Sequence, residues 1–417
     1  MAYIVTQRTI FDYNEIEILG DLERFRLALE GIDDERLMTK LELKRKNGRD
    51  DYPIRVMWNL FIAMRVFEHK SVSSFRRECM RNSGLRKICG LNDHDNKKHL
   101  VPPERVFSHF LKLLMTEQEE VDNIFRTQVE SLYETIEGFG ETLAGDGKYI
   151  DSYAKNKSKK EMTSTDNRSE NDAEYSIKEY NYTDEKGINH TKKETHYGFK
   201  AHIICDVATE LPVTFTVTKS NYDEKKAMME LVKEFKVEQN QIAKNLLLDR
   251  GYDSTDMIKH LKVREINPII DIRNMWKNET TKQYKDTNIV YNAYGEVFYI
   301  DEKIEQHKMK YEGYDRQKKC LRYSHNGKIY KIYISYDERI FLPIARDSKK
   351  FKEIYKGRTA VERLNGRLDR DYMFENHQIR GLEKMRLMVS IAMIVMNGMA
   401  VGKIKNNIST IRSLKTA

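Results

Sequence analysis

A change of periodicity near residue 142 constrains the fold of this chain more than any other feature. Beyond it, apolar residues alternate with polar ones in short runs, whereas the preceding segments have helical spacing. Four strand-like runs and one helix follow in the order strand, strand, strand, helix, strand. The runs are TLAGDGKYI (142–150), HYGFKAHIICDV (196–207), VTFTVTK (213–219) and NLLLD (245–249), and the helix follows SNYDEKK (220–226). This order predicts an α/β fold built on a mixed sheet.

The rest of the chain divides around this sheet. Residues 1–135 are predicted to form a helical N-terminal DNA-binding domain, although a plain helical bundle would have the same pattern. Residues 140–273 are the first part of the core, in which the polar stretch 155–195 is expected to be a long loop. IVYNAYGEVFYI and KIYKIYISY indicate a β-rich insertion over residues 274–340. Residues 341–417 return to helical spacing and form the last part of the core.

Charge and cysteine content limit the compartment and the partners. The 417 residues include 73 Lys and Arg against 65 Asp and Glu, a net charge of +8 that permits a polyanionic partner without requiring one. The four cysteines are far apart and form no CxxC pair, which fits a reducing compartment. The start MAYIVTQRTI contains no signal-peptide pattern. The apolar run 387–401 is shorter than the roughly 20 residues of a membrane span. We expect a cytoplasmic protein without a membrane partner.

Three separated carboxylates have places on these elements. Asp146 lies in the first strand, Asp249 ends the fourth, and Glu362 lies on a helix within YKGRTAVERLNGRLDRDY (355–372). If the strand order is of the ribonuclease H type, the aspartates occupy neighbouring central strands and the helix can pack across them. Clustered carboxylates repel one another, so such a cluster is sensible where divalent cations occupy it. We therefore predict that these three residues are catalytic and hold two Mg²⁺ ions, for which Mn²⁺ can substitute.

Each acid taken alone also fits a structural role. Asp146 precedes Gly147 and could start a turn, and Asp249 could form an ion pair at a strand end. Glu362 could be a solvated helix residue that pairs with Arg358 four residues before it. The joint placement of the three acids favours the metal site.

The pattern around these acids resembles a known family. Tyr355-x2-Arg358-x3-Glu362 is similar to the Tyr-Arg-Glu-Lys signature of bacterial insertion-sequence DDE transposases of the insertion-sequence-four group. Asp146-Gly147 and LLLDRGYDS (246–254) resemble the first and second aspartate motifs of that family. The family's Asn-x-x-Asp turn is matched loosely, because Glu224 stands three residues after Asn221. The likeness spans roughly residues 50–375.

The resemblance implies a ribonuclease-H-like catalytic core, a homodimer on double-stranded DNA, and DNA contacts near the acids. Arg358 is expected to hold a DNA phosphate, and Tyr355 to bind phosphate or stack on a base. Arg250 and Tyr252, which adjoin Asp249, are assigned to DNA binding as well.

One residue departs from the family signature. The family pattern places a lysine seven positions after the glutamate, at position 369, and Asp369 stands there. Arg367 or Arg370 is our candidate for the phosphate contact of that lysine. An arginine would change the geometry of the contact, because its planar fork binds phosphate through two nitrogens.

The resulting prediction is a DNA transposase that cleaves terminal inverted repeats and transfers the freed 3′-OH into target DNA. Two alternatives remain open at this point. One is a ribonuclease-H-like nuclease that cuts without strand transfer, and the other is an inactive or domesticated DNA-binding relative.

Overall fold

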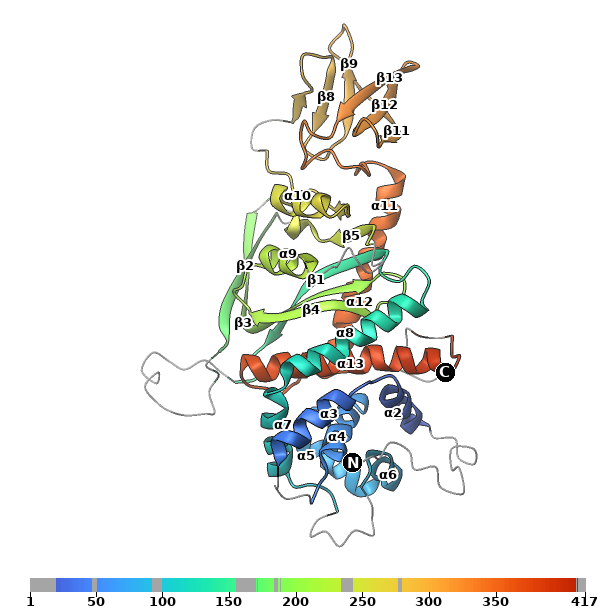
Figure 1. Cartoon of the computed structure of the whole chain (residues 1–417). Coiled ribbons are helices and arrows are strands. Elements are labelled where there is room, and N and C mark those ends of the chain that lie inside the picture. Colours follow the sequence, from blue (N-terminus) through green and yellow to red (C-terminus); the bar gives the residue numbers. More distant parts are fainter. Residues whose placement is uncertain are drawn as a thin grey trace.

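The computed structural model describes most of the chain, and Figure 1 shows the arrangement of its elements. The described residues are 20–46, 51–91, 100–154, 170, 172–183, 187, 189–233, 243–276, 280–409 and 411.

A six-stranded mixed sheet forms the centre of the molecule (Figure 1). Its strands are β1 (Thr142–Asp151), β2 (Glu174–Thr183), β3 (Asn189–Asp206), β4 (Pro212–Lys219), β5 (Asn245–Leu248) and β6 (Asn267–Ile270). β3 pairs antiparallel with β1 and with β4, whereas β5 runs parallel to β1 and β6 parallel to β5. The sheet therefore contains the order β4-β3-β1-β5-β6, with three antiparallel strands followed by two parallel ones.

This order is that of a ribonuclease-H-like core, as the sequence predicts. The parallel connections require crossover helices. α9 (Glu224–Lys233) lies between β4 and β5, and α10 (Thr255–Val263) lies between β5 and β6. β5 and β6 are short and end in buried apolar residues, which is typical of parallel strands covered on both faces.

The stretch 155–195 is not simply a loop, which corrects the sequence prediction. β2 and the first half of β3 form a long antiparallel ladder from Glu174–Gly198 to Thr183–Asn189. Tyr175 and Ile177 on β2 are 50% and 61% exposed, so apolar burial on that side does not explain the strand. The backbone ladder holds it instead. Residues 155–169 of this stretch lie outside the described residues.

Seven described helices precede the sheet. They are α2 (Asp21–Glu30), α3 (Glu35–Arg45), α4 (Ile54–Val66), α5 (Val72–Arg81), α6 (Ser83–Cys89), α7 (Glu104–Met115) and α8 (Gln118–Thr135). Ser71 caps α5 by accepting a hydrogen bond from the Ser74 backbone N–H at 3.2 Å. Gly84 lies inside α6 rather than ending a helix, because the Asn82 side chain starts a new helix directly after α5.

The expected β-rich insertion contains two small sheets. One has the order β10-β9-β8-β7, and the other β11-β12-β13. The strands are β7 (Thr281–Gln283), β8 (Ile289–Asn292), β9 (Val297–Ile300), β10 (Gln306–Lys308), β11 (Lys310–Asp315), β12 (Cys320–His325) and β13 (Lys328–Tyr333). They lie at the end of the molecule opposite the N-terminal helices (Figure 1).

Helices return after the insertion. α11 (Lys349–Tyr355), the 3₁₀ turn η3 (Lys356–Arg358) and α12 (Thr359–Arg370) follow one another, and α13 (Leu382–Lys405) ends the described elements. The helix α13 is long and apolar enough to span a membrane. It is longer than the apolar run 387–401 from which its length is predicted. Nearly all of its apolar segment is buried inside the fold, as expected for a core helix.

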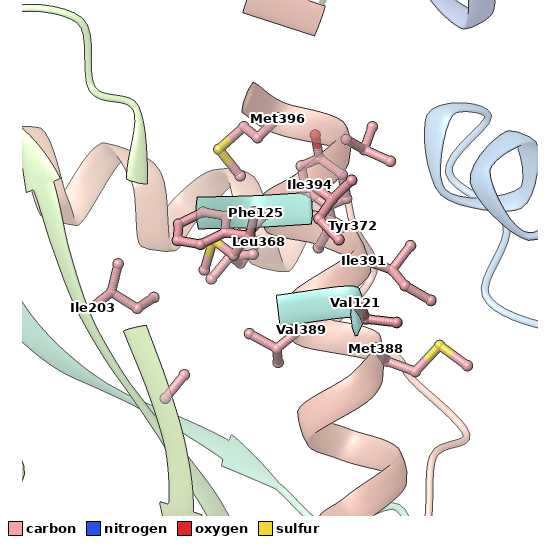
Figure 2. Close-up of a cluster of buried hydrophobic side chains, with 14 of the residues drawn as sticks. Val121, Phe125, Ile203, Leu368, Tyr372, Met388, Val389, Ile391, Ile394 and Met396 are labelled. Atoms are coloured by element: carbon pink, nitrogen blue, oxygen red, sulfur yellow. The ribbon is translucent and has the colours of Figure 1, made fainter. Parts of the chain in front are cut away.

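The described buried residues form two clusters. The larger joins the N-terminal helices, the sheet, α12 and α13, and Figure 2 shows Phe125 of α8, Ile203 of β3, Leu368 of α12 and Ile391 of α13 converging in it. The smaller lies within the β insertion and its flanks and includes Tyr291 and Phe341. The predicted boundary near residue 135 thus runs through a shared core, and the domain limits stay a prediction.

Candidate active site

The central strands place two predicted aspartates at the same edge of the sheet. The parallel register pairs Gly145 of β1 with Leu248 of β5, so the next residue on each chain segment is an aspartate. Asp146 is partly buried within β1, whereas Asp249 is exposed just beyond the end of β5. The sequence order of strands therefore brings Asp146 and Asp249 together.

The helix α12 lies over these strands. Val361, Leu364 and Leu368 are buried on its inner face, as their spacing predicts. Asn365, on the flank of this face, donates a hydrogen bond from Nδ2 to Oδ2 of Asp146 at 3.3 Å. Glu362 lies one turn before Asn365, so the third predicted acid is carried to the same region.

Glu362 is paired with an arginine. Nη2 of Arg358 lies 2.7 Å from Oε1 of Glu362, which is 47% exposed. Arg358 also lies 6.0 Å from the centre of the Tyr355 ring, which stacks on Phe351. These residues do not share one continuous α-helix, because η3 separates α11 from α12. Gly357 allows this turn to approach the sheet, since a Cβ there would lie 2.7 Å from Val207.

The electrostatic state of Asp146 reflects its neighbours. The pKa of this carboxyl is raised to about 6, mainly by burial and in addition by the charges of Asp249 and Glu224. The hydrogen bond from the Gly147 backbone and the charge of Arg358 act in the opposite direction. Asp146, Asp249 and Glu224 thus form a group of mutually repelling acids.

These acids fit a divalent cation by the chemistry of their donor atoms. They offer hard carboxylate oxygens, and a cation would remove the repulsion that raises the pKa of Asp146. Glu362 forms an ion pair with Arg358 in the structure. The carboxylate oxygens of Asp146, Asp249 and Glu362 do not all lie within 4.8 Å of one another. Among the described residues, one triad has ligand atoms all within 4.8 Å of one another: Asp301, Glu305 and His307 of the insertion.

That triad has a local explanation. Asp301 accepts hydrogen bonds from the backbone N–H groups of Lys303 and Glu305 at 2.9 Å, and His307 Nε2 lies 3.0 Å from its other oxygen. The turn between β9 and β10 therefore brings the three side chains together without a ligand.

Glu224 occupies the loosely matched turn position and is held by two lysines. Its carboxylate lies 2.7 Å from Lys200 Nζ and 3.4 Å from Lys178 Nζ. Burial alone would raise the pKa of Glu224, but the hydrogen bonds and charges of Lys200 and Lys178 together outweigh it, so the pKa is lowered. Glu224 is accordingly an ionised neighbour of Asp146 with partners of its own.

Two residues that we predicted to bind DNA, Tyr252 and Arg367, are buried in the protein. Tyr252 is 2% exposed, and its hydroxyl has no hydrogen-bond partner among the described residues. The ring packs in the core because η2 (Arg250–Tyr252) turns the chain inward after β5. Arg367 is 8% exposed and donates from Nη2 to the backbone oxygen of Glu210 at 2.5 Å. Both side chains are part of the protein interior.

The other two basic candidates are exposed. Arg250 lies 2.5 Å from Asp271, which directly follows β6 at the same sheet edge as Asp249. Arg370 lies 2.7 Å from the adjacent Asp371. Both remain candidates for contact with DNA, and so do Tyr355 and Arg358.

Sequence reasoning missed three residues near the acids. Asn365 bonds Asp146, Asp271 bonds Arg250, and Lys148 lies 2.5 Å from Asp369. Each had a signal in the sequence. Asn365 follows Glu362 by one turn, Asp271 ends the strand-like run INPIID, and Lys148 is two residues after Asp146 on the same face of β1.

The strand order, together with the acids next to the paired residues Gly145 and Leu248 of the central strands β1 and β5, defines the class of the protein. It is a ribonuclease-H-like fold with a candidate metal site. A model of the transposase DDE domain family matches residues 161–397. The chain belongs to this family, which comprises polynucleotidyl transferases and nucleases that act in transposition.

Comparison with solved structures finds a match to a piggyBac transposase, whose structure is a cryo-EM synaptic complex with hairpin DNA. The TM-score is 0.43 and the identity 12%, over 96% of this chain and 78% of that one. No curated protein matches this sequence.

Proposed function

We propose that this protein is a DNA transposase of the insertion-sequence-four-like group. It cleaves DNA at the terminal inverted repeats of its element and transfers the freed 3′-OH into target DNA. The observation that carries the proposal is the placement of Asp146 and Asp249 on adjacent strands beneath the helix that bears Glu362. The membership of the transposase DDE domain family supports it.

In the proposed reaction Asp146, Asp249 and Glu362 hold two Mg²⁺ ions, for which Mn²⁺ can substitute. When bound, the ions supply positive charge to the attacking and leaving oxygens of phosphoryl transfer. Asn365 orients the Asp146 carboxylate through its hydrogen bond. Arg358 releases Glu362 and holds a DNA phosphate, and the half-buried Tyr355 and the exposed Arg250 and Arg370 contact the backbone nearby.

The proposal includes partners and a location. The protein acts on double-stranded DNA as a homodimer that pairs two element ends. It works in the bacterial cytoplasm at the nucleoid, with no membrane partner. The buried state of α13 supports the last point, since the apolar helix is covered by the protein itself.

The decisive experiment uses duplexes taken from the DNA that borders the gene, together with a labelled target plasmid and Mg²⁺. The wild-type protein is expected to nick the duplex at one position and to join its 3′ end to the plasmid. Asp146→Asn, Asp249→Asn and Glu362→Gln should each reduce both products by about 10³-fold or more, because each removes a metal-binding charge. Asp256→Asn, an exposed neighbour on α10, is the matched control and should leave both products unchanged.

The same assay separates the alternatives. Cut ends without any joined product would identify a nuclease. An inactive DNA-binding relative would bind the duplex without forming either product, whether or not the wild-type protein binds Mg²⁺.

A further inference from the structure

The face of β1 that carries Asp146 also carries a lysine. Side chains alternate along a strand, so Asp146 and Lys148 point to the same side of the sheet, about 7 Å apart along the strand. That side is covered by α12, since Asn365 bonds Asp146. Lys148 therefore belongs to the surroundings of the candidate active site.

Asp369 of α12 fixes the position of this lysine. Glu362, Asn365 and Asp369 follow one another at spacings of three and four residues and form one stripe along the helix. Nζ of Lys148 lies 2.5 Å from Oδ2 of Asp369. Two contacts thus join the strand and the helix, Asp146 to Asn365 and Lys148 to Asp369, one turn apart on α12.

Lys148 retains the capacity to bind an anion. An ammonium group has three N–H donors, and the described residues provide one acceptor, the Asp369 carboxylate. The Lys148 side chain is 11% exposed and the Asp369 side chain 33%, so the pair is reached from solvent mainly past the carboxylate. A phosphate oxygen can take a second donor while the ion pair persists.

The arginines of α12 are less suited to this position. Arg367 is buried and bonded to the backbone of Glu210, which leaves its guanidinium inside the fold. Arg370 is exposed but pairs with Asp371 at the end of the helix. Among the described residues, Lys148 contacts Asp369 and also lies on the face of β1 that carries Asp146.

We propose that Lys148 binds a DNA phosphate next to the cleaved bond, and that Asp369 is the positioning residue that holds its ammonium group there. The cation near position 369 thus comes from β1 rather than from α12. This inference rests on the proposed function, because it requires DNA at the Asp146 edge.

The test measures how DNA affinity depends on salt. Each phosphate contact by a cation adds about 0.9 to the slope of log K against log salt concentration. Binding of duplexes from the DNA that borders the gene is measured in Ca²⁺ buffer over a series of KCl concentrations. Lys148→Met should lower the slope by about 0.9 and weaken affinity about tenfold at moderate salt. Lys148→Arg, which keeps the charge, should retain the wild-type slope.

Two further variants separate phosphate binding from a purely structural role. Lys148→Gln keeps a hydrogen-bond donor for Asp369 but has no charge, so it should fold normally and show the same reduced slope as the methionine variant. Lys244→Met is the matched control. Lys244 forms a similar pair with Glu141 at 2.6 Å, but at the start of β5, the opposite end of that strand from Asp249.

An unchanged slope in folded Lys148→Gln protein would overturn the inference, whatever its thermal stability. A reduced slope in Lys244→Met would overturn it as well, because the effect would then reflect total charge. Failure of the proposed function is distinguishable from both. In that case the wild-type protein either does not bind these duplexes or binds them without cutting or joining them in Mg²⁺.

Discussion

At Asp146 the protein keeps a carboxylate where burial and other acids oppose its ionisation. Its pKa is raised to about 6 from an ordinary value of 3.8, first by burial and then by Asp249 and Glu224. The folded state therefore binds this proton more tightly than the unfolded state. Stability from this group is fully present below about pH 4 and is lost as the pH rises through about 6.

The raised pKa of Asp146 gives a prediction for the metal-free protein. Asp146→Asn removes the ionisation cost and should raise the free energy of unfolding at pH 8, by at most about 3 kcal/mol, the equivalent of the pKa difference. The gain should shrink at pH 5. Urea unfolding with a chelator at both pH values measures it.

Asp256→Asn serves as the control and should change stability little at either pH. Equal free energies of unfolding for wild-type and Asp146→Asn protein at pH 8 would contradict the conclusion that ionisation of Asp146 destabilises the metal-free fold.

On the scale of elements, the loop after β5 connects the candidate active site to the insertion. Asp253, four residues after Asp249, is buried, and its Oδ2 lies 2.6 Å from Arg339 Nη2. The same oxygen accepts the backbone N–H of Arg273 at 3.0 Å, and Arg346 lies 3.7 Å from its other oxygen. Asp253 thus ties both ends of the β insertion to the segment that carries Asp249.

Removal of the Asp253 carboxylate should lower the free energy of unfolding. Asp253→Ala leaves the buried guanidinium of Arg346 without its counter-charge, and we expect a loss of about 3–5 kcal/mol in unfolding free energy. Asp256→Ala, exposed on α10, should change it by less than about 0.5 kcal/mol. Chemical denaturation of the two variants checks this, and equal losses would show that the Asp253 ion pairs do not stabilise the junction.

The elements that the sequence predicted well are those with a buried face. The alternation in 196–207 and the short apolar run 245–249 identified β3 and β5, and their order implied the adjacency of Asp146 and Asp249. β2 was missed because its exposed Tyr175 and Ile177 leave no clear alternation between core and solvent. Lys148 was missed because its importance depends on Asp369, more than 200 residues away along the chain.

On the scale of the whole molecule, α13 joins regions that the sequence separates. It contacts α2, α4, α7, α8 and β4. Its glycines permit the closest approaches, since a Cβ at Gly402 would lie 2.0 Å from the Leu27 backbone oxygen. Gly31 of the N-terminal region is equally tight against Gly398. The N-terminal helices and the sheet therefore share one core around this helix (Figure 2).

A consequence is that the N-terminal region should not be dispensable for folding. Protein lacking residues 1–135 exposes apolar surface of α13 and of the sheet, and we expect it to be insoluble or to lack a cooperative thermal transition. Expression, circular dichroism and thermal melting of the truncated chain test this. A soluble truncated protein with a sharp transition would show that residues 136–417 fold independently.

The late synthesis of α13 affects when the N-terminal helices can finish packing. Chains are made from the N-terminus, and domains generally fold as they emerge from the ribosome. Here α2, α4, α7 and α8 pack against the described helix made last, so the surfaces that they bury on α13 stay uncovered until translation has passed residue 405. A nascent chain consequently cannot complete the packing of its N-terminal helices before α13 has emerged from the ribosome.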